Sequence, residues 1–413
     1  MPVVNVFCGS YCGAEQVVRG VIEKTGFRYV DDADLVSATG KRFNIEENRL
    51  WRALIGKTSI FNKFTREKER SLACFKQVLA DHLRQDDLLL FGLSSLMVPR
   101  TISHVLNVCM IADIGYRSNV ACGVEKISQK DAIKKIRKDD ESLAVWVEDL
   151  FGRRDPWAAE LYDIVIPMDK TAQEDAVRLI CDNLKRSVLI VTEDSLRAVA
   201  DFALACEVNL RLVEQGHDVS VLAKDGIVVM EINKHVMMLA SLEEELKKLA
   251  SAVPGVKEAE TKVGPGYYQS DVYRKFDFEV PSPSKVLLVD DERDFAEALS
   301  ERLQMRDYSS AAVYGGEEAL SIVEEDEPDV MILDLKMPGI DGLEVLRRVK
   351  EKHPNVEVIV LTGHGSEEAA RLCLELGACA YLEKPVDIDK LTKAMQEARQ
   401  KIKEYKKPRP TGH

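Results

Sequence analysis

Acidic residues follow two apolar runs in the last third of the chain, and this arrangement constrains the fold more than any other feature. Asp290 and Asp291 follow the run Val286–Val289, and Asp334 follows the run Val330–Leu333. Parallel strands that end side by side place these three carboxylates at the carboxyl edge of one sheet, where open α/β sheets bind ligands. Three like charges repel one another unless a cation lies between them, and Mg²⁺ prefers such oxygen ligands. The sequence therefore predicts a magnesium site at the edge of a parallel sheet.

Two further apolar runs end in residues that can contact an anion. Val356–Leu361 leads into Thr362, and Ala380–Glu383 leads into Lys384. A hydroxyl and an ammonium group thereby join the carboxylates at the same edge. Between the runs, apolar residues recur at helical spacing. Alternating strands and helices predict a doubly wound parallel sheet.

An acidic pair, a lone aspartate, a threonine and a lysine, in that order and each at a strand end, resemble the receiver domain of bacterial response regulators. The resemblance covers residues 284–404 and implies a five-stranded α/β domain, bound Mg²⁺ and a sensor histidine kinase as partner. The implied roles are phosphoacceptor for Asp334, direct metal ligand for Asp291, water-mediated ligand for Asp290, third metal contact for the backbone carbonyl of Lys336, switch hydroxyl for Thr362, phosphoryl-pairing cation for Lys384 and switch aromatic for Tyr381. The face that the switch alters would serve as a homodimer surface or as a dock for the upstream domains.

Little sequence follows the receiver-like segment. After Lys384 come one helix and a basic tail at residues 405–413, without a helix-turn-helix pattern. No DNA-binding domain is evident there, so we expect the output of the protein in the residues before 284.

Composition limits the remaining classes. A formal net charge of −13 and a pI of about 5.2 argue against nonspecific nucleic-acid binding over most of the chain. Nine cysteines lack paired zinc spacing and are expected to be reduced. No signal peptide is evident, and the longest uncharged stretch, Leu88–Pro99, is too short to span a bilayer. We expect a cytoplasmic protein.

Two breaks divide the chain before the receiver-like segment. Pro281–Ser284 predicts a stiff linker, and a helix is expected to end near Lys185–Ser187. The predicted domains are therefore residues 1–184, 187–280 and 284–404.

The first segment begins with a strand, a turn and a helix. A glycine-containing turn at Cys8–Gly13 can aim backbone N–H groups at an anion, which makes Gly9, Ser10 and Gly13 candidate phosphate contacts. The order of the following elements, including a strand expected at Phe27–Leu35, resembles the cytidylate-kinase-like family. That resemblance implies a P-loop α/β fold, nucleotide as ligand, and Arg117 in or beside the lid.

This segment departs from the kinase pattern at the phosphate turn. The Walker form ends in Gly-Lys-Ser or Gly-Lys-Thr, but Gly13-Ala14-Glu15 stands here. The missing lysine and the carboxylate of Glu15 favour a kinase-like domain without catalysis. The alternative is a nucleoside monophosphate kinase that phosphorylation of Asp334 regulates.

Residues 187–280 predict a smaller α+β unit. A long helix precedes a hairpin with an Asp225-Gly226 turn, and a second helix and a closing strand follow. This order resembles a BON domain, a family that binds lipids or small ligands or docks domains. No catalytic set of residues is visible in it.

Overall fold

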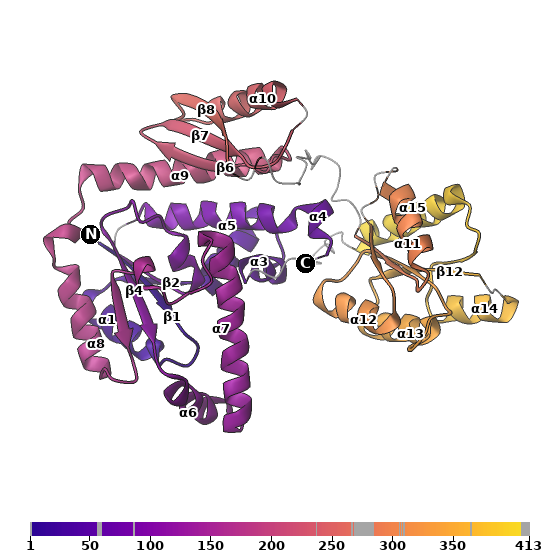
Figure 1. Cartoon of the computed structure of the whole chain (residues 1–413), viewed down its shortest axis with the longest axis horizontal. Coiled ribbons are helices and arrows are strands. Elements are labelled where there is room, and N and C mark those ends of the chain that lie inside the picture. Colours follow the sequence, from indigo (N-terminus) through magenta and orange to yellow (C-terminus); the bar gives the residue numbers. More distant parts are fainter. Residues whose placement is uncertain are drawn as a thin grey trace, which may run out of the picture. The chain divides into compact units, whose positions relative to one another are not determined.

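The computed structural model describes residues 2–55, 60–85, 87–236, 238–265, 267, 285–304, 306, 308, 310–363 and 366–405 (Figure 1). The chain forms two compact units. The first comprises Met1–Thr58 and Glu67–Asp277, and the second comprises Ser59–Arg66 and Phe278–His413. The predicted linker at 281–284 and the tail at 406–413 lie outside the described residues.

A five-stranded parallel sheet forms the centre of the first unit, as the sequence predicts. Its strand order is β2-β3-β1-β4-β5. The central strand β1 is buried on both faces over Val3–Phe7, as strands covered by helices on each side require. The strands are β1 Val3–Cys8, β2 Arg28–Asp31, β3 Leu88–Phe91, β4 Val105–Ile111 and β5 Ile164–Pro167.

Helices pack on both faces of this sheet. One hydrophobic core joins β1 to α1 and α8, and a second joins the opposite face to α2 and α5. The helices are α1 Ala14–Thr25, α2 Asp32–Phe43, α3 Glu47–Leu54, α5 Glu67–Leu83, α6 Ile114–Glu125, α7 Gln129–Phe151 and α8 Gln173–Leu184, with 3₁₀ turns at Leu93–Met97, Ala159–Leu161 and Ser187–Leu189.

The second predicted strand is shorter than expected. It ends at Asp31, because the side chain of Asp31 accepts a hydrogen bond from the backbone N–H of Asp34 and caps α2. The acidic residues that follow therefore begin a helix. Asp32, in the first turn, accepts hydrogen bonds from the backbone N–H groups of Leu93 and Ser94.

The smaller α+β part has the predicted order of helix, hairpin, helix and strand. It consists of α9 Glu193–Glu214, β6 Ser220–Lys224, β7 Ile227–Ile232, α10 Leu239–Ser251 and β8 Glu258–Val263. Asp225 and Gly226 form the hairpin turn with φ of 54° and 85°. The long helix α9 also packs against α5, where Ala203 and Cys206 cluster with Ala80. Figure 1 shows α9 running between α5 and the sheet of β6, β7 and β8, and side chains of this one helix belong to hydrophobic clusters on both sides.

The second unit contains a doubly wound parallel sheet of five strands, which confirms the predicted fold class. Its strand order is β10-β9-β11-β12-β13. Its elements are β9 Val286–Val289, α11 Arg293–Gln304, β10 Ser310–Val313, α12 Gly316–Glu325, β11 Val330–Leu333, α13 Gly342–Lys352, β12 Glu357–Thr362, α14 Glu367–Glu375, β13 Ala380–Glu383 and α15 Ile388–Tyr405. Helices α11 and α15 cover one face of the sheet, and α12 and α13 cover the other.

A segment from much earlier in the sequence belongs to this second unit. It contains the short helix α4, Asn62–Thr65, and the preceding Phe61. The side chain of Phe61 is fully buried and is part of the hydrophobic cluster that includes Leu287 and Met331.

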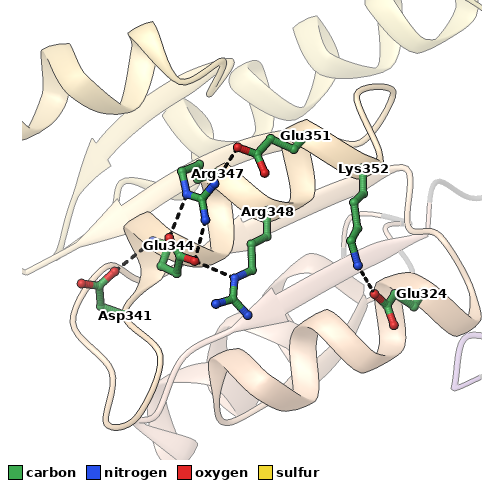
Figure 2. A network of polar contacts seen from close by, with 7 residues as sticks. All are labelled: Glu324, Asp341, Glu344, Arg347, Arg348, Glu351 and Lys352. Carbon is green, nitrogen blue, oxygen red and sulfur yellow. Dashed lines mark hydrogen bonds and ion pairs between the residues drawn. The ribbon is translucent and has the colours of Figure 1, made fainter.

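Ion pairs cover the exposed side of α13 (Figure 2). Glu344 accepts hydrogen bonds from Arg347 and Arg348, and these bonds lower the pKa of Glu344 to about 2. A separate pair joins the two helices, because Lys352 donates to Glu324 of α12 at 2.7 Å. Within the described part of the chain, no helix is both long and apolar enough to cross a membrane.

Candidate functional site

Three strand ends meet at the carboxyl edge of the second unit's sheet. Asp290 follows β9, Asp334 follows β11, and Lys384 follows β13. The Nζ atom of Lys384 lies 2.6 Å from Oδ2 of Asp290 and 2.8 Å from Oδ2 of Asp334. The structure therefore brings together the lysine and two of the carboxylates that the sequence places at this edge.

The charges at this edge stabilise one another. Asp290 and Asp334 are 3% and 5% exposed, and buried carboxylates require a charged or hydrogen-bonding partner. Burial raises the pKa of Asp290, while the ammonium group of Lys384 acts against that rise. Burial alone would lower the pKa of Lys384, but hydrogen bonds to the two carboxylates raise it. Lys384 is therefore a cation fixed between two anions.

A third carboxylate completes a group that can hold a metal ion. Carboxylate oxygens of Asp290, Glu292 and Asp334 lie within 4.8 Å of one another, and among the described residues they form the one such group. Hard oxygen donors of this kind suit Mg²⁺. Sequence reasoning missed Glu292, whose signal is its place directly after the acidic pair. Asp291 is half-buried and lies outside this group.

Backbone hydrogen bonds orient the two buried carboxylates. The N–H of Glu292 donates to Oδ1 of Asp290 at 3.0 Å, and the N–H of Lys336 donates to Oδ1 of Asp334 at 3.2 Å. In each case the amide lies two residues after the carboxylate, which is an Asx turn at a strand end. The Oδ2 atoms of both carboxylates are therefore oriented toward the ammonium group of Lys384.

The two predicted switch residues lie on the adjoining strands. Thr362 ends β12 and is buried, and its carbonyl accepts a hydrogen bond from the N–H of Lys384 at 2.9 Å. Tyr381 lies in β13 and packs against the core cluster on the α12–α13 side. Burial raises the pKa of its hydroxyl. In this structure the ring of Tyr381 is therefore turned into the domain.

The turn at Cys8–Gly13, which the sequence predicts to contact phosphate, has the backbone geometry of a tight strand-to-helix connection. We call it the phosphate-like turn. Tyr11 and Gly13 adopt left-handed conformations, with φ of 61° and 74°. A Cβ at Gly9 would lie 2.7 Å from Cδ1 of Ile111, so any side chain at this position would have to displace the end of the Ile111 side chain. The helix α1 begins directly after Gly13 without a side-chain cap.

Side chains of α6 and α7 form hydrogen bonds and an ion pair beside this turn. Arg117 is buried, and its guanidinium forms a two-bond ion pair with Asp140 at 2.7 and 2.9 Å. Its Nε donates to the carbonyl of Ser10 at 2.7 Å. The hydroxyl of Ser10 donates to Asp139 at 3.0 Å. Two of the predicted anion contacts, Ser10 and Arg117, are thus close together, but carboxylates of the chain itself bind the serine hydroxyl and the guanidinium.

Two family models match the chain. The model described as response regulator receiver domain matches residues 286–396, and the model of the cytidylate kinase-like family matches residues 3–170. The sporulation initiation phosphotransferase F of Bacillus subtilis is 37% identical over 112 residues, which are 27% of this chain and 90% of that protein.

Solved structures match the same region. A receiver domain of a putative LuxO repressor protein from Vibrio parahaemolyticus is 31% identical, with a TM-score of 0.28, over 29% of this chain and 92% of that one. A receiver domain protein from Clostridium thermocellum is 34% identical, also with a TM-score of 0.28, over 29% and 97%. At these TM-scores, the assignment depends on the family model and the Bacillus relative.

Proposed function

The chain belongs to the response regulators, and we propose that Asp334 is the residue through which a sensor histidine kinase phosphorylates it. The observation that carries this proposal is the position of Lys384, whose ammonium lies 2.8 Å from the Asp334 carboxylate and 2.6 Å from Asp290. Phosphoryl transfer depends mainly on positioning and on charge neutralisation, and this site supplies both.

In the proposed reaction, one oxygen of Asp334 attacks the phosphorus of the partner's phosphohistidine. The new P–O bond forms as the P–N bond breaks, and the histidine nitrogen keeps the electron pair of that bond. Lys384 pairs with a phosphoryl oxygen, and Thr362 donates its hydroxyl hydrogen to another. Asp290, Glu292 and Asp334 would hold Mg²⁺, with Asp291 and the Lys336 carbonyl as further predicted ligands. Bound Mg²⁺ supplies positive charge to the transferring oxygens.

Phosphorylation of the purified full chain tests this proposal. With Mg²⁺ and acetyl phosphate, we expect one phosphoryl group per chain, measured by intact mass, and none on Asp334→Asn. Asp341→Asn is the matched control, because Asp341 lies in the same loop but caps α13. Undiminished phosphorylation of Asp334→Asn would contradict the assignment.

We further propose that the output is a binding function of the kinase-like domain, without phosphoryl transfer to a nucleotide. The supporting observation is that Asp140 and Asp139 hold Arg117 and Ser10 beside the phosphate-like turn. Because the P-loop lysine is missing, its charge-assisted hydrogen bond to the phosphate, which contributes roughly 1.5–3 kcal/mol, is absent as well. Losing ~3 kcal/mol of transition-state stabilisation costs about two decades in rate. In this scheme the BON-like part is a docking or ligand-binding module, and the protein acts in the cytoplasm.

A coupled assay distinguishes this output from the regulated-kinase alternative. The full chain is mixed with ATP and CMP, UMP or dCMP, with and without beryllofluoride and Mg²⁺. We expect turnover well under about 1 s⁻¹, the low end of ordinary enzymes, in every combination. Faster turnover in either state would establish a nucleoside monophosphate kinase instead.

A further inference from the structure

The hydrophobic core of the second unit contains a side chain that the receiver sequence itself does not supply. Phe61 is 0% exposed and shares a cluster with Leu287, Val323 and Met331. In the sequence it lies between α3 and α5, far outside the region 286–396 that matches the receiver family. The receiver region alone therefore does not account for the whole of this core.

The surface that receives Phe61 is built around a buried ion pair. Lys285 and Asp326 are paired at 2.9 Å, with side chains that are 8% and 7% exposed. The Nζ of Lys285 lies 6.0 Å from the centre of the Phe61 ring, within the range of a cation–π contact. Charges this deeply buried need an oppositely charged partner, which Lys285 and Asp326 supply to each other, and the Phe61 ring lies beside the ammonium group of this pair.

The residues after Phe61 form a short turn of helix that depends on this packing. The N–H of Thr65 donates to the carbonyl of Phe61 at 3.0 Å, and the N–H of Arg66 donates to that of Asn62 at 3.0 Å. Asn62 and Thr65 are buried, whereas Ile60 is 40% exposed. An isolated helix of four residues is not stable in water, so its shape requires tertiary contacts.

We propose that residues 60–65 are a docking segment for the receiver, and that the surface around Lys285 and Asp326 is its binding surface. The partner of this surface is thus a piece of the same chain that the sequence places inside the kinase-like region. The surface lies at the amino edge of the sheet, because Lys285 directly precedes β9 and its N–H donates to Asp329, which directly precedes β11.

This location connects the docking segment to the phosphorylation site through two strands. Strand β9, Val286–Val289, lies between Lys285 and Asp290 in the sequence, and strand β11, Val330–Leu333, lies between Asp329 and Asp334. Four residues of extended chain span about 13 Å. The docking segment and the acidic site therefore lie at opposite ends of the same two buried strands.

Hydrogen exchange of the full chain, without phosphorylation, tests the proposal. We expect the amides of Thr65 and Arg66 to be protected in the wild type. Phe61→Ala should expose them and should speed exchange in β9 and β11 by on the order of a hundredfold, as truncation of a buried phenylalanine typically does. Phe61→Leu, which keeps most of the apolar volume, should give a smaller increase. Ile60→Ala is the neighbouring control and should leave both regions unchanged.

Two results would contradict the proposal that residues 60–65 are a docking segment. One is unprotected exchange at Thr65 and Arg66 in the wild type. The other is a Phe61→Ala effect confined to residues 2–55 and 67–111, with β9 and β11 unchanged. Because no arm requires phosphorylation, failure of Asp334 as phosphoacceptor would leave this test intact.

Discussion

Among the residues that the structure describes, Lys384 is the cation that pairs with both buried carboxylates, Asp290 and Asp334. Lys384→Met should leave both carboxylates unpaired and lower the free energy of unfolding by about 3 kcal/mol, as the loss of one partner of a buried pair does. Mg²⁺ should stabilise this variant more than the wild type, because it restores the missing positive charge. Hydrogen exchange of β9 and β11, with and without Mg²⁺, measures both effects.

The neighbouring Lys336 provides the control for that experiment. Its side chain is exposed, so Lys336→Met should change neither the stability nor its dependence on Mg²⁺. Equal stability of Lys384→Met and wild type without Mg²⁺ would show that the ion pairs at the site contribute nothing to the apo fold.

Arg117 offers a second residue-scale prediction, in the kinase-like domain. Asp140→Ala should destabilise that domain by about 3 kcal/mol, because the buried guanidinium loses its carboxylate. Sulfate or phosphate should recover more of this stability than chloride at equal ionic strength, since an oxyanion can take the carboxylate's place. Thermal unfolding in the three salts measures the recovery.

Glu141→Ala is the control for Asp140→Ala. Glu141 lies next in α7 and pairs with Arg154 at an exposed position, where ion pairs contribute little. An Asp140→Ala variant that gains no more from sulfate than from chloride would show that the pocket beside the turn does not accept an oxyanion.

The residues at the two sites differ in how far the sequence could reveal them. Asp290, Asp334 and Lys384 each follow an apolar run, and parallel pairing necessarily brings such strand ends together. The partner of Arg117 follows no such rule. Which acid of α7 reaches the guanidinium depends on how that helix is rotated and packed, which a charge run does not encode.

At the scale of elements, the ion-pair network on α13 predicts a pH dependence (Figure 2). Hydrogen bonds from Arg347 and Arg348 lower the pKa of Glu344 from its ordinary 4.5 to about 2. A carboxyl group whose pKa is lower in the folded state than in the unfolded state stabilises the folded state. This stabilisation is fully present at pH values above the unfolded-state pKa, and it is lost as the pH falls through the folded-state pKa. The wild type should therefore be more stable than Glu344→Gln by a constant amount above pH 4.5, and this difference in stability should vanish toward pH 2.

Hydrogen exchange of α13 in the two proteins at several pH values measures this advantage. High salt should reduce it, because the pairs lie at the surface. Glu301→Gln, at an exposed position of α11, is the control. An advantage that grows as the pH falls from 4.5 would contradict the assigned direction of the Glu344 pKa.

Element boundaries show where local signals are sufficient. The Asp225-Gly226 turn placed the hairpin correctly, because both residues tolerate the positive φ that a two-residue turn requires. The strand expected at Phe27–Leu35 instead ends at Asp31, where the capping bond to the Asp34 amide begins a helix. Strand propensity and helix capping compete at that position, and the side-chain hydrogen bond decides the outcome.

At the scale of the whole molecule, phosphorylation and docking should be coupled. Beryllofluoride with Mg²⁺ at Asp334 should change hydrogen exchange in α14 and in β13 around Tyr381. Through β9 and β11, it should also change exchange in residues 62–66. Asp334→Asn, which cannot bind beryllofluoride in this way, is the control. A response in α14 and β13 without one in residues 62–66 would show that the docking segment is structural and does not carry the signal.

The sequence identified the receiver fold but not the contribution of Phe61 to its core. Apolar periodicity reports which face of an element is buried, and it does not report against what. A lone phenylalanine in a short segment between two helices carries no signal for a partner so distant along the chain.

The position of Phe61 also has a consequence for the synthesis of the protein. Domains of a growing chain fold largely in the order in which they leave the ribosome. Phe61 leaves the ribosome long before β9 and β11. The first unit therefore folds while the Phe61 side chain is still exposed to water, because the strands that bury it have not yet been synthesised. Nascent chains that stop before Lys285 should therefore bind chaperones and aggregate more readily than the finished protein, and replacing Phe61 with a polar residue should relieve that defect in the truncated chain alone.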